Sequence, residues 1–135
     1  MSYYAVIDTN IVVSSMLRCL SIPGKIIDYV ISGKIIPLLN EEIVEEYIEV
    51  LSRDEFGFSK ADINDLILFF REKGIFLERT TAIEKFIDQD DAVFFEIVTT
   101  ARKTTEAYLV TGNTKHFPIK YFVVTPREML EIIDK

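Results

Sequence analysis

The sequence predicts an α/β domain over residues 1–135, with three layers in which helices cover both faces of a mostly parallel sheet. Three observations support this prediction. A chain of 135 residues is about the size of one domain. Continuous apolar runs at residues 4–7 and 107–110 are typical of strands that are buried on both faces. Apolar residues recur at helical spacing between them, and strands that alternate with helices favour parallel pairing through right-handed crossovers.

The first predicted elements are a strand, a helix and a second strand. The apolar run at residues 4–7 has the β-branched content of a buried strand. Apolar residues at helical spacing predict a helix over residues 25–31, which Gly33 would end. Another apolar run predicts a strand at residues 35–39, where Pro37 favours an outer position in the sheet or the end of the strand.

The middle of the chain contains two predicted helices with recognisable ends. Asn40 is a candidate N-cap for a helix that runs to about Arg53, with acidic residues beside the positive end of the helix dipole. Ser59 begins the next helix, which Gly74 ends. Residues 75–77 then form a short strand or an extended connection.

The last third of the chain continues the alternation. A helix opens at residues 88–91, and the run at residues 107–110 predicts the next strand. Residues 122–124 predict the last strand, and Pro126 stands at the first position of a terminal helix. The chain shows no repeat and no linker that would divide it.

Composition narrows the classes of function. The net charge of −7 argues against a broad basic surface for nucleic acid, so such a role would need a local basic patch, a metal or a basic partner. Cys19 is the only cysteine, which excludes an intramolecular disulfide and a thiolate zinc cluster. No run reaches the roughly 20 apolar residues of a membrane span, and no signal sequence is recognised. We therefore expect no membrane association, and a cytoplasmic protein.

Four polar side chains are expected at one edge of the sheet. Asp8 directly follows the first strand, and Asn113 follows the later strand. The carboxyl ends of parallel strands lie at the same edge, where ligands bind in open α/β sheets. Helices begin at this edge too, so Asp91 can reach it, and Glu46 lies on a helix that starts there.

If these carboxylates cluster, their mutual repulsion must be offset by protons or by a divalent cation. Two ionised carboxylates about 4 Å apart repel by roughly 4 kcal/mol at an effective dielectric constant of 20. Carboxylate and amide oxygens without thiols select a hard cation such as Mg²⁺ or Mn²⁺. Such a site can bridge a phosphodiester and activate a water. The only histidine, His116, is interpreted as a hydrogen-bonded structural residue and not as a ligand.

Each candidate also has a simpler interpretation. Residues 8–10 can form a turn at the strand end in which the polar side chains bond local backbone. Glu46 can be a solvated helix flank, and helical geometry prefers it over Glu45 only slightly. Asp88 and Asp91 can simply cap a helix N-terminus.

Four short segments, in this order and spacing, carry a family resemblance. They are residues 6–10 with Ser14, residues 46–47 with 50–51, residues 88–91, and residues 109–113 before the run at 115–118. On these segments the chain resembles the PIN domain family of metal-dependent nucleases, which includes ribonuclease toxins of bacterial and archaeal toxin–antitoxin pairs. The resemblance covers nearly the whole chain, and the closing segment resembles a toxin-like subgroup.

The resemblance implies a site and an activity. The family carries an acidic quartet, which here is matched by Asp8, Glu46, Asp91 and Asn113, the last standing where an aspartate is usual. It implies an Mg²⁺- or Mn²⁺-dependent endoribonuclease in which Asp8 and Asp91 hold the metal and Glu46 ligates directly or through water. Asn113 would complete the site, with one negative charge fewer and weaker ligation.

The resemblance also implies supporting residues and partners. Thr9, Asn10, Asp88 and Thr111 are candidates for orienting the acids or binding phosphate. The implied partners are an RNA substrate, a protein antitoxin and a second copy of the chain in a homodimer.

Two other functions are consistent with the sequence. Because Asn113 replaces an acid, the chain can be a catalytically silent PIN-like module that binds RNA or a protein partner. A phosphatase with Asp8 as nucleophile, resembling haloacid-dehalogenase-like enzymes, is disfavoured because Asn10 stands where those enzymes have a second acid.

Overall fold

Five strands form one sheet in the order β3-β2-β1-β4-β5 in the computed structural model, which describes residues 1–86 and 88–135. Every pairing between these strands is parallel, which confirms the predicted α/β class. The strands are β1 (Tyr3–Ile7), β2 (Ile35–Leu39), β3 (Ile75–Phe76), β4 (Ala107–Val110) and β5 (Val123–Val124).

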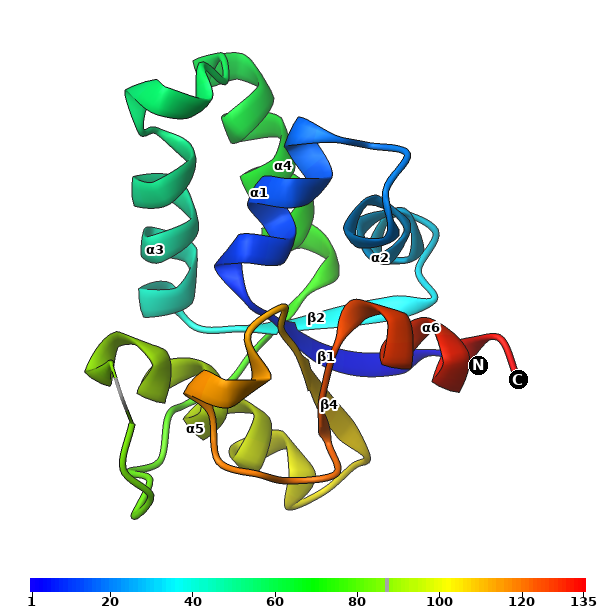
Figure 1. The fold of residues 1–135 in the computed structure, drawn as a ribbon, viewed down its shortest axis with the longest axis vertical. Helices are drawn as coiled ribbons and strands as arrows, with labels where there is room; N and C mark the ends of the chain where they lie inside the picture. Colours follow the sequence, from blue (N-terminus) through cyan, green and yellow to red (C-terminus); the bar gives the residue numbers. More distant parts are fainter. Residues whose placement is uncertain (87) are drawn as a thin grey trace.

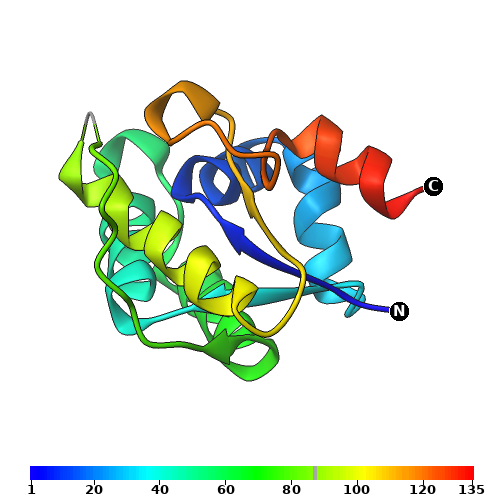
Figure 2. The ribbon, with the colours of Figure 1, turned by 90° about the horizontal axis from the view of Figure 1, so that it is seen from below.

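Helices cover both faces of the sheet (Figure 1). Helix α5 packs against β1, β2 and β4 on one face, which Figure 2 shows from the α5 side. The other face carries the first four helices, and α6 packs beside α2. The helices are α1 (Thr9–Leu17), α2 (Ile22–Ile31), α3 (Glu41–Leu51), α4 (Lys60–Lys73), α5 (Ala92–Arg102) and α6 (Pro126–Ile133), with short 3₁₀ helices η1 (Asp54–Phe56), η2 (Gln89–Asp91) and η3 (Thr114–His116).

The core explains the continuous apolar runs of the sequence. Ala5, Val6 and Ile7 of β1 have no exposed surface, because helices cover both faces of the central strand. Helix α5 is buried from Ala92 to Val98, since it lies between the sheet and the segment that precedes it. Fully burying a valine, isoleucine or phenylalanine side chain contributes about 1.5–3 kcal/mol to the stability of the fold.

The predicted outer position of the second strand is wrong. Strand β2 lies between β1 and β3, and Pro37 pairs with Ala5. The carbonyl of Leu39 accepts a hydrogen bond from Leu77 on the β3 side, and residues two apart in a strand point the same way. The missing N–H of Pro37 therefore faces the β3 side, where pairing begins only at Leu38. The proline removes no ladder bond there.

Helix α1 was not predicted. It begins at Thr9, directly after the strand, and Asp8 caps it by accepting a hydrogen bond from Thr9 N at 2.8 Å. The β-branched residues Ile11, Val12 and Val13 lower helix propensity. All three are buried, so packing against the core decides the conformation.

The predicted helix caps are confirmed. Asn40 accepts from Ile43 N at 2.9 Å, and Ser59 accepts from Asp62 N at 3.1 Å. Thr125 caps α6 in a complete capping box. In the part of the chain that the structure describes, no single helix is long and apolar enough to cross a membrane; α1 and α2 together, bent by 101°, meet that criterion by length and composition.

Candidate functional site

Asp8 stands at the carboxyl end of the central strand and its carboxylate is fixed in place. Its backbone N–H donates to the Val110 carbonyl at 2.9 Å, which joins the ends of β1 and β4. Oδ1 accepts from Thr9 N at 2.8 Å, and Oδ2 accepts from Thr111 Oγ1 at 2.7 Å. Only 8% of Asp8 is exposed, and burial raises its pKa above the ordinary value despite these two donors.

Thr111 links Asp8 to the loop that follows β4. The side chain of Thr111 is fully buried, and its Oγ1 accepts a hydrogen bond from Asn113 N at 3.0 Å while it donates to Asp8. The side chain of Asn113 is exposed and lies 3.2–3.3 Å from the ring nitrogens of His116. Asn113 therefore supports Asp8 through its backbone, whereas its amide group faces the histidine.

Glu46 is the glutamate of α3 that faces the site. Its Oε2 accepts a hydrogen bond from Thr9 Oγ1, one residue after Asp8, whereas Glu45 is exposed. Partial burial raises the pKa of Glu46, and the negative charges of Asp8 and Asp91 raise it further. Helical geometry alone separated Glu46 from Glu45 only slightly, and the tertiary structure separates them clearly.

Asp91 holds a buried oxygen atom without a hydrogen-bond partner. It is the last residue of η2, directly before α5, and its Oδ2 is buried with no partner among the described residues. His116 Nδ1 lies 3.5 Å away, which is too long for a strong hydrogen bond. Burial and the negative charges of Asp8 and Asp88 raise the pKa of Asp91 to about 6. An unsatisfied carboxylate oxygen of this kind is suited to a cation.

His116 lies beside the site, although the sequence analysis interpreted it only as a hydrogen-bonded structural residue. Its ring contacts the side chain of Asn113 and forms the ion pair with Asp91 when it is protonated. The short helix η3 brings Asn113 and His116 onto one side, since residues three apart eclipse in a 3₁₀ helix. A 3₁₀ turn after β4 was the signal that the sequence analysis missed.

The two remaining candidates, Asp88 and Asn10, are exposed and lie outside the hydrogen-bond network of Asp8. Asp88 is exposed and caps η2 by accepting from Asp90 N at 2.9 Å, which agrees with the simpler capping interpretation. Asn10 is exposed beside Gly112, where an added Cβ would lie 3.7 Å from Asn10 Nδ2. Neither side chain has a hydrogen bond to Asp8 in the described structure.

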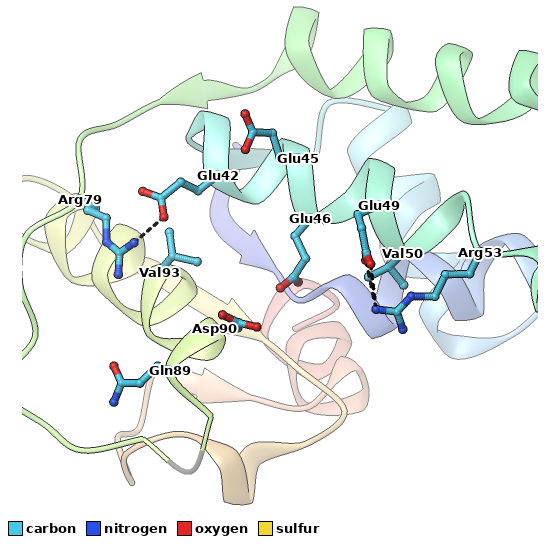
Figure 3. A pocket seen from close by; sticks show the side chains of 10 residues that line it. All are labelled: Glu42, Glu45, Glu46, Glu49, Val50, Arg53, Arg79, Gln89, Asp90 and Val93. Atoms are coloured by element: carbon cyan, nitrogen blue, oxygen red, sulfur yellow. Dashed lines mark hydrogen bonds and ion pairs between the residues drawn. The ribbon is translucent and has the colours of Figure 1, made fainter.

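A cleft of about 520 Å³ lies between α3 and the η2–α5 segment (Figure 3). Glu46 and Asp90 point toward each other across it. Its two arginines are both paired: Arg53, just after α3, with Glu49 four residues earlier, and Arg79 with Glu42 and Glu96. The cleft is lined by Glu42, Glu45, Glu46, Glu49, Val50, Arg53, Arg79, Gln89, Asp90 and Val93.

The donor atoms fit a hard cation that keeps part of its water shell. Over residues 1–86 and 88–135, no group of three or more His, Cys, Asp or Glu side chains is arranged to hold a metal ion. Mg²⁺ commonly uses one or two carboxylates, with waters and substrate phosphates as its other ligands. Asp8 and the unsatisfied oxygen of Asp91 can supply these two carboxylates.

The raised pKa of Asp91 predicts how metal-free stability depends on pH. Its pKa is 3.8 in the ordinary case and about 6 in the folded protein. The folded state therefore binds the proton more tightly, and the stability from this group is fully present below 3.8 and lost as pH rises through about 6. In chelator, we expect Asp91→Asn to melt roughly 3 °C above the wild type near pH 7.5. This advantage should shrink as the pH falls through about 6 and disappear below 3.8.

Thermal melts across this pH range provide the measurement. Asp65→Asn, an exposed aspartate on α4, is the control for removal of one negative charge. If Asp91→Asn and Asp65→Asn differ from the wild type by the same amount at every pH, the explanation from burial and charge is wrong.

Comparison with known proteins assigns the chain to a family. A family model described as PIN domain matches residues 4–115, a span that contains Asp8, Glu46, Asp91 and Asn113. Searches of curated proteins and of solved structures returned no match to the chain. The matched span covers most of the 135 residues, and the parallel α/β/α architecture agrees with it. The chain therefore belongs to the PIN domain family.

Proposed function

We propose that this chain is an Mg²⁺- or Mn²⁺-dependent endoribonuclease that hydrolyses RNA phosphodiester bonds, acting in the cytoplasm as one domain over residues 1–135. PIN domains are generally nucleases and typically use divalent metals. The observation that carries the proposal is the buried Oδ2 of Asp91, which has no hydrogen-bond partner among the described residues. Burial, and then the negative charge of Asp8, raise the pKa of this carboxyl group.

The chain's own residues have separate tasks in this proposal. Asp8 and Asp91 would hold the cation directly, and Glu46 would reach it directly or through a water. Thr9 and Thr111 fix the carboxylates of Glu46 and Asp8 by donating to them. When bound, the cation lowers the pKa of a coordinated water and neutralises charge on the phosphate. Preorganised ligands avoid the cost of reorienting dipoles during the reaction.

Asn113 and His116 form the side of the site that faces β4. Asn113 N holds Thr111 Oγ1, so the fourth position of the quartet still supports Asp8 without adding a negative charge. His116 is 40% exposed in its side chain and is available to a phosphate when protonated. The net charge of −7 gives RNA little general attraction, so recognition relies on the cation and such local donors.

The biological setting that we propose is a toxin held in check by a protein antitoxin, with a homodimer as the working form. The resemblance of residues 109–118 to the toxin-like subgroup supports this proposal. RNA as the substrate rests on the same resemblance, whereas the fold supports the broader nuclease assignment.

The adjacent glutamates of α3 provide the sharpest test of the activity. A mixed panel of structured and single-stranded RNAs would be incubated with the protein in Mg²⁺, in Mn²⁺ and in chelator. We expect metal-dependent cleavage that falls about 10- to 100-fold in Glu46→Gln and changes little in Glu45→Gln, because only Glu46 contacts Thr9. Equal losses in both variants would contradict the site.

A catalytically silent module that binds RNA or a protein partner is the second candidate. It is favoured by Asn113 at the fourth position and by the lack of a group of three metal-binding side chains among the described residues. Binding of RNA without cleavage in either metal, together with no metal-dependent rise in melting temperature, would support it against the nuclease.

A further inference from the structure

Two helices on opposite faces of the sheet supply acidic residues to the site. Glu46 projects from α3, and Asp91 directly precedes α5. The cleft separates these two helices, and Glu46 and Asp90 face each other across it (Figure 3). The spacing of Glu46 and Asp91 therefore depends on how α3 and α5 are held relative to each other.

A side chain from outside both helices connects α3 and α5. Arg79, in the segment after β3, donates through Nη1 to Glu42 Oε2 on α3 at 2.5 Å. Through Nε it donates to Glu96 Oε1 on α5. Glu42 lies one helical turn before Glu46, and Glu96 lies in the first half of the helix that Asp91 precedes. Figure 3 shows the contact of Arg79 with Glu42 at the edge of the cleft.

The α5 end of this connection is firmly held. Glu96 is only 4% exposed, and its second oxygen accepts from Ala82 N at 2.8 Å. Thr80 and Thr100 form a further hydrogen bond at 3.2 Å between the same segment and α5. Arg79 is thus anchored on α5, and its contact with Glu42 reaches outward to α3.

We propose that Arg79 is a positioning residue that bridges α3 and α5 and thereby sets the spacing of Glu46 and Asp91. The assignment of these two carboxylates to a metal site rests on the proposed function, whereas the bridge between the helices does not. The guanidinium suits this task because its planar fork places two donor directions at fixed angles.

The chain contains natural controls for this proposal. Glu49 lines the same cleft but pairs with Arg53 of the same helix region at i,i+4, so its ion pair does not cross to α5. Glu41 shares the first turn of α3 with Glu42 but pairs with Arg71 of α4. Glu49→Gln reproduces the change in cleft charge, and Glu41→Gln reproduces the loss of an acid at the helix N-terminus.

The test measures the distance between the helices in the metal-free protein. Spin labels would be placed at Ile48→Cys on α3 and Lys103→Cys at the end of α5, in a Cys19→Ser background. Glu42→Gln removes only the exposed half of the bridge, so Glu96 keeps its partner. We expect double electron–electron resonance to show a longer or broader distance distribution in Glu42→Gln, and an unchanged one in both controls.

A second measurement connects the bridge to the site. Titration with Mn²⁺ is expected to show about tenfold weaker affinity in Glu42→Gln than in Glu49→Gln or Glu41→Gln, because residues that orient ligands contribute about 10- to 100-fold to metal affinity. A wild-type distance distribution in Glu42→Gln would overturn the bridge, and so would an equal change in either control. If no variant binds Mn²⁺ but the distance changes as expected, the bridge stands and the metal-dependent activity fails.

Discussion

Asp8→Asn is expected to lower metal-dependent RNA cleavage by about 10³-fold, which corresponds to roughly 4 kcal/mol of transition-state stabilisation. Asp8 is the buried acid at the end of the central strand, and both its oxygens are oriented by fixed donors. The asparagine keeps one oxygen for Thr9 N but removes the charge that a cation requires. Cleavage assays in Mg²⁺, in Mn²⁺ and in chelator measure the loss, and a calorimetric Mn²⁺ titration should show that binding is lost with it.

The same variant is expected to stay folded. Burial raises the pKa of Asp8, which means that the ionised carboxylate is less favourable in the folded protein than in the unfolded chain. A neutral side chain of the same shape relieves that cost, so the metal-free variant should melt at or above the temperature of the metal-free wild type. Loss of activity then reports on the site and not on unfolding.

Asp65→Asn is the matched control, because it removes one exposed carboxylate from α4, away from the site. It should retain cleavage and Mn²⁺ binding. Undiminished cleavage in Asp8→Asn would remove Asp8 from the metal site. A cooperative melt at clearly lower temperature would instead contradict the account of its burial.

Arg79→Met is expected to lower the free energy of unfolding by about 3 kcal/mol, the low end of the range for breaking a buried ion pair, because water reaches part of Arg79. Methionine keeps much of the aliphatic packing but leaves the carboxylate of Glu96, whose side chain is 6% exposed, without the guanidinium that pairs with it. Urea denaturation followed by circular dichroism measures the change. The expected shift in melting temperature is roughly 10 °C.

Two further variants show whether the ion pair itself is responsible. Arg53→Met breaks an exposed i,i+4 pair and should cost less than about 1 kcal/mol. Arg79→Met/Glu96→Met removes both partners and should recover most of the loss, because no uncompensated charge remains buried. If the double variant is no more stable than Arg79→Met, the pair is not coupled as the structure indicates.

Local chemistry made much of the fold predictable. The caps at Asn40 and Ser59 act within one helical turn, so a sequence of a few residues is sufficient to recognise them. The strand at residues 107–110 is buried on both faces, so it can be recognised in the sequence as a continuous apolar run. The first strand and the terminal helix at Pro126 were recognised for the same kind of reason.

The misassigned elements depend on distant contacts. Pro37 normally indicates an edge strand, and here it is tolerated inside the sheet because β3 starts pairing one residue later. The β-branched residues of α1 argue against a helix, and burial against the core overrides that preference. Neither outcome can be read from a window of neighbouring residues.

The sequence by itself indicated the parallel α/β architecture and one sheet edge for Asp8, Asp91 and Asn113, because the carboxyl ends of parallel strands and the starts of helices lie at the same edge. Only the tertiary structure decided that Glu46 and not Glu45 meets Thr9, and that Asn113 turns its side chain to His116. It alone decided the connection of α3 to α5 through Arg79. Side-chain direction and packing between helices depend on residues far apart in the chain, and no local pattern encodes them.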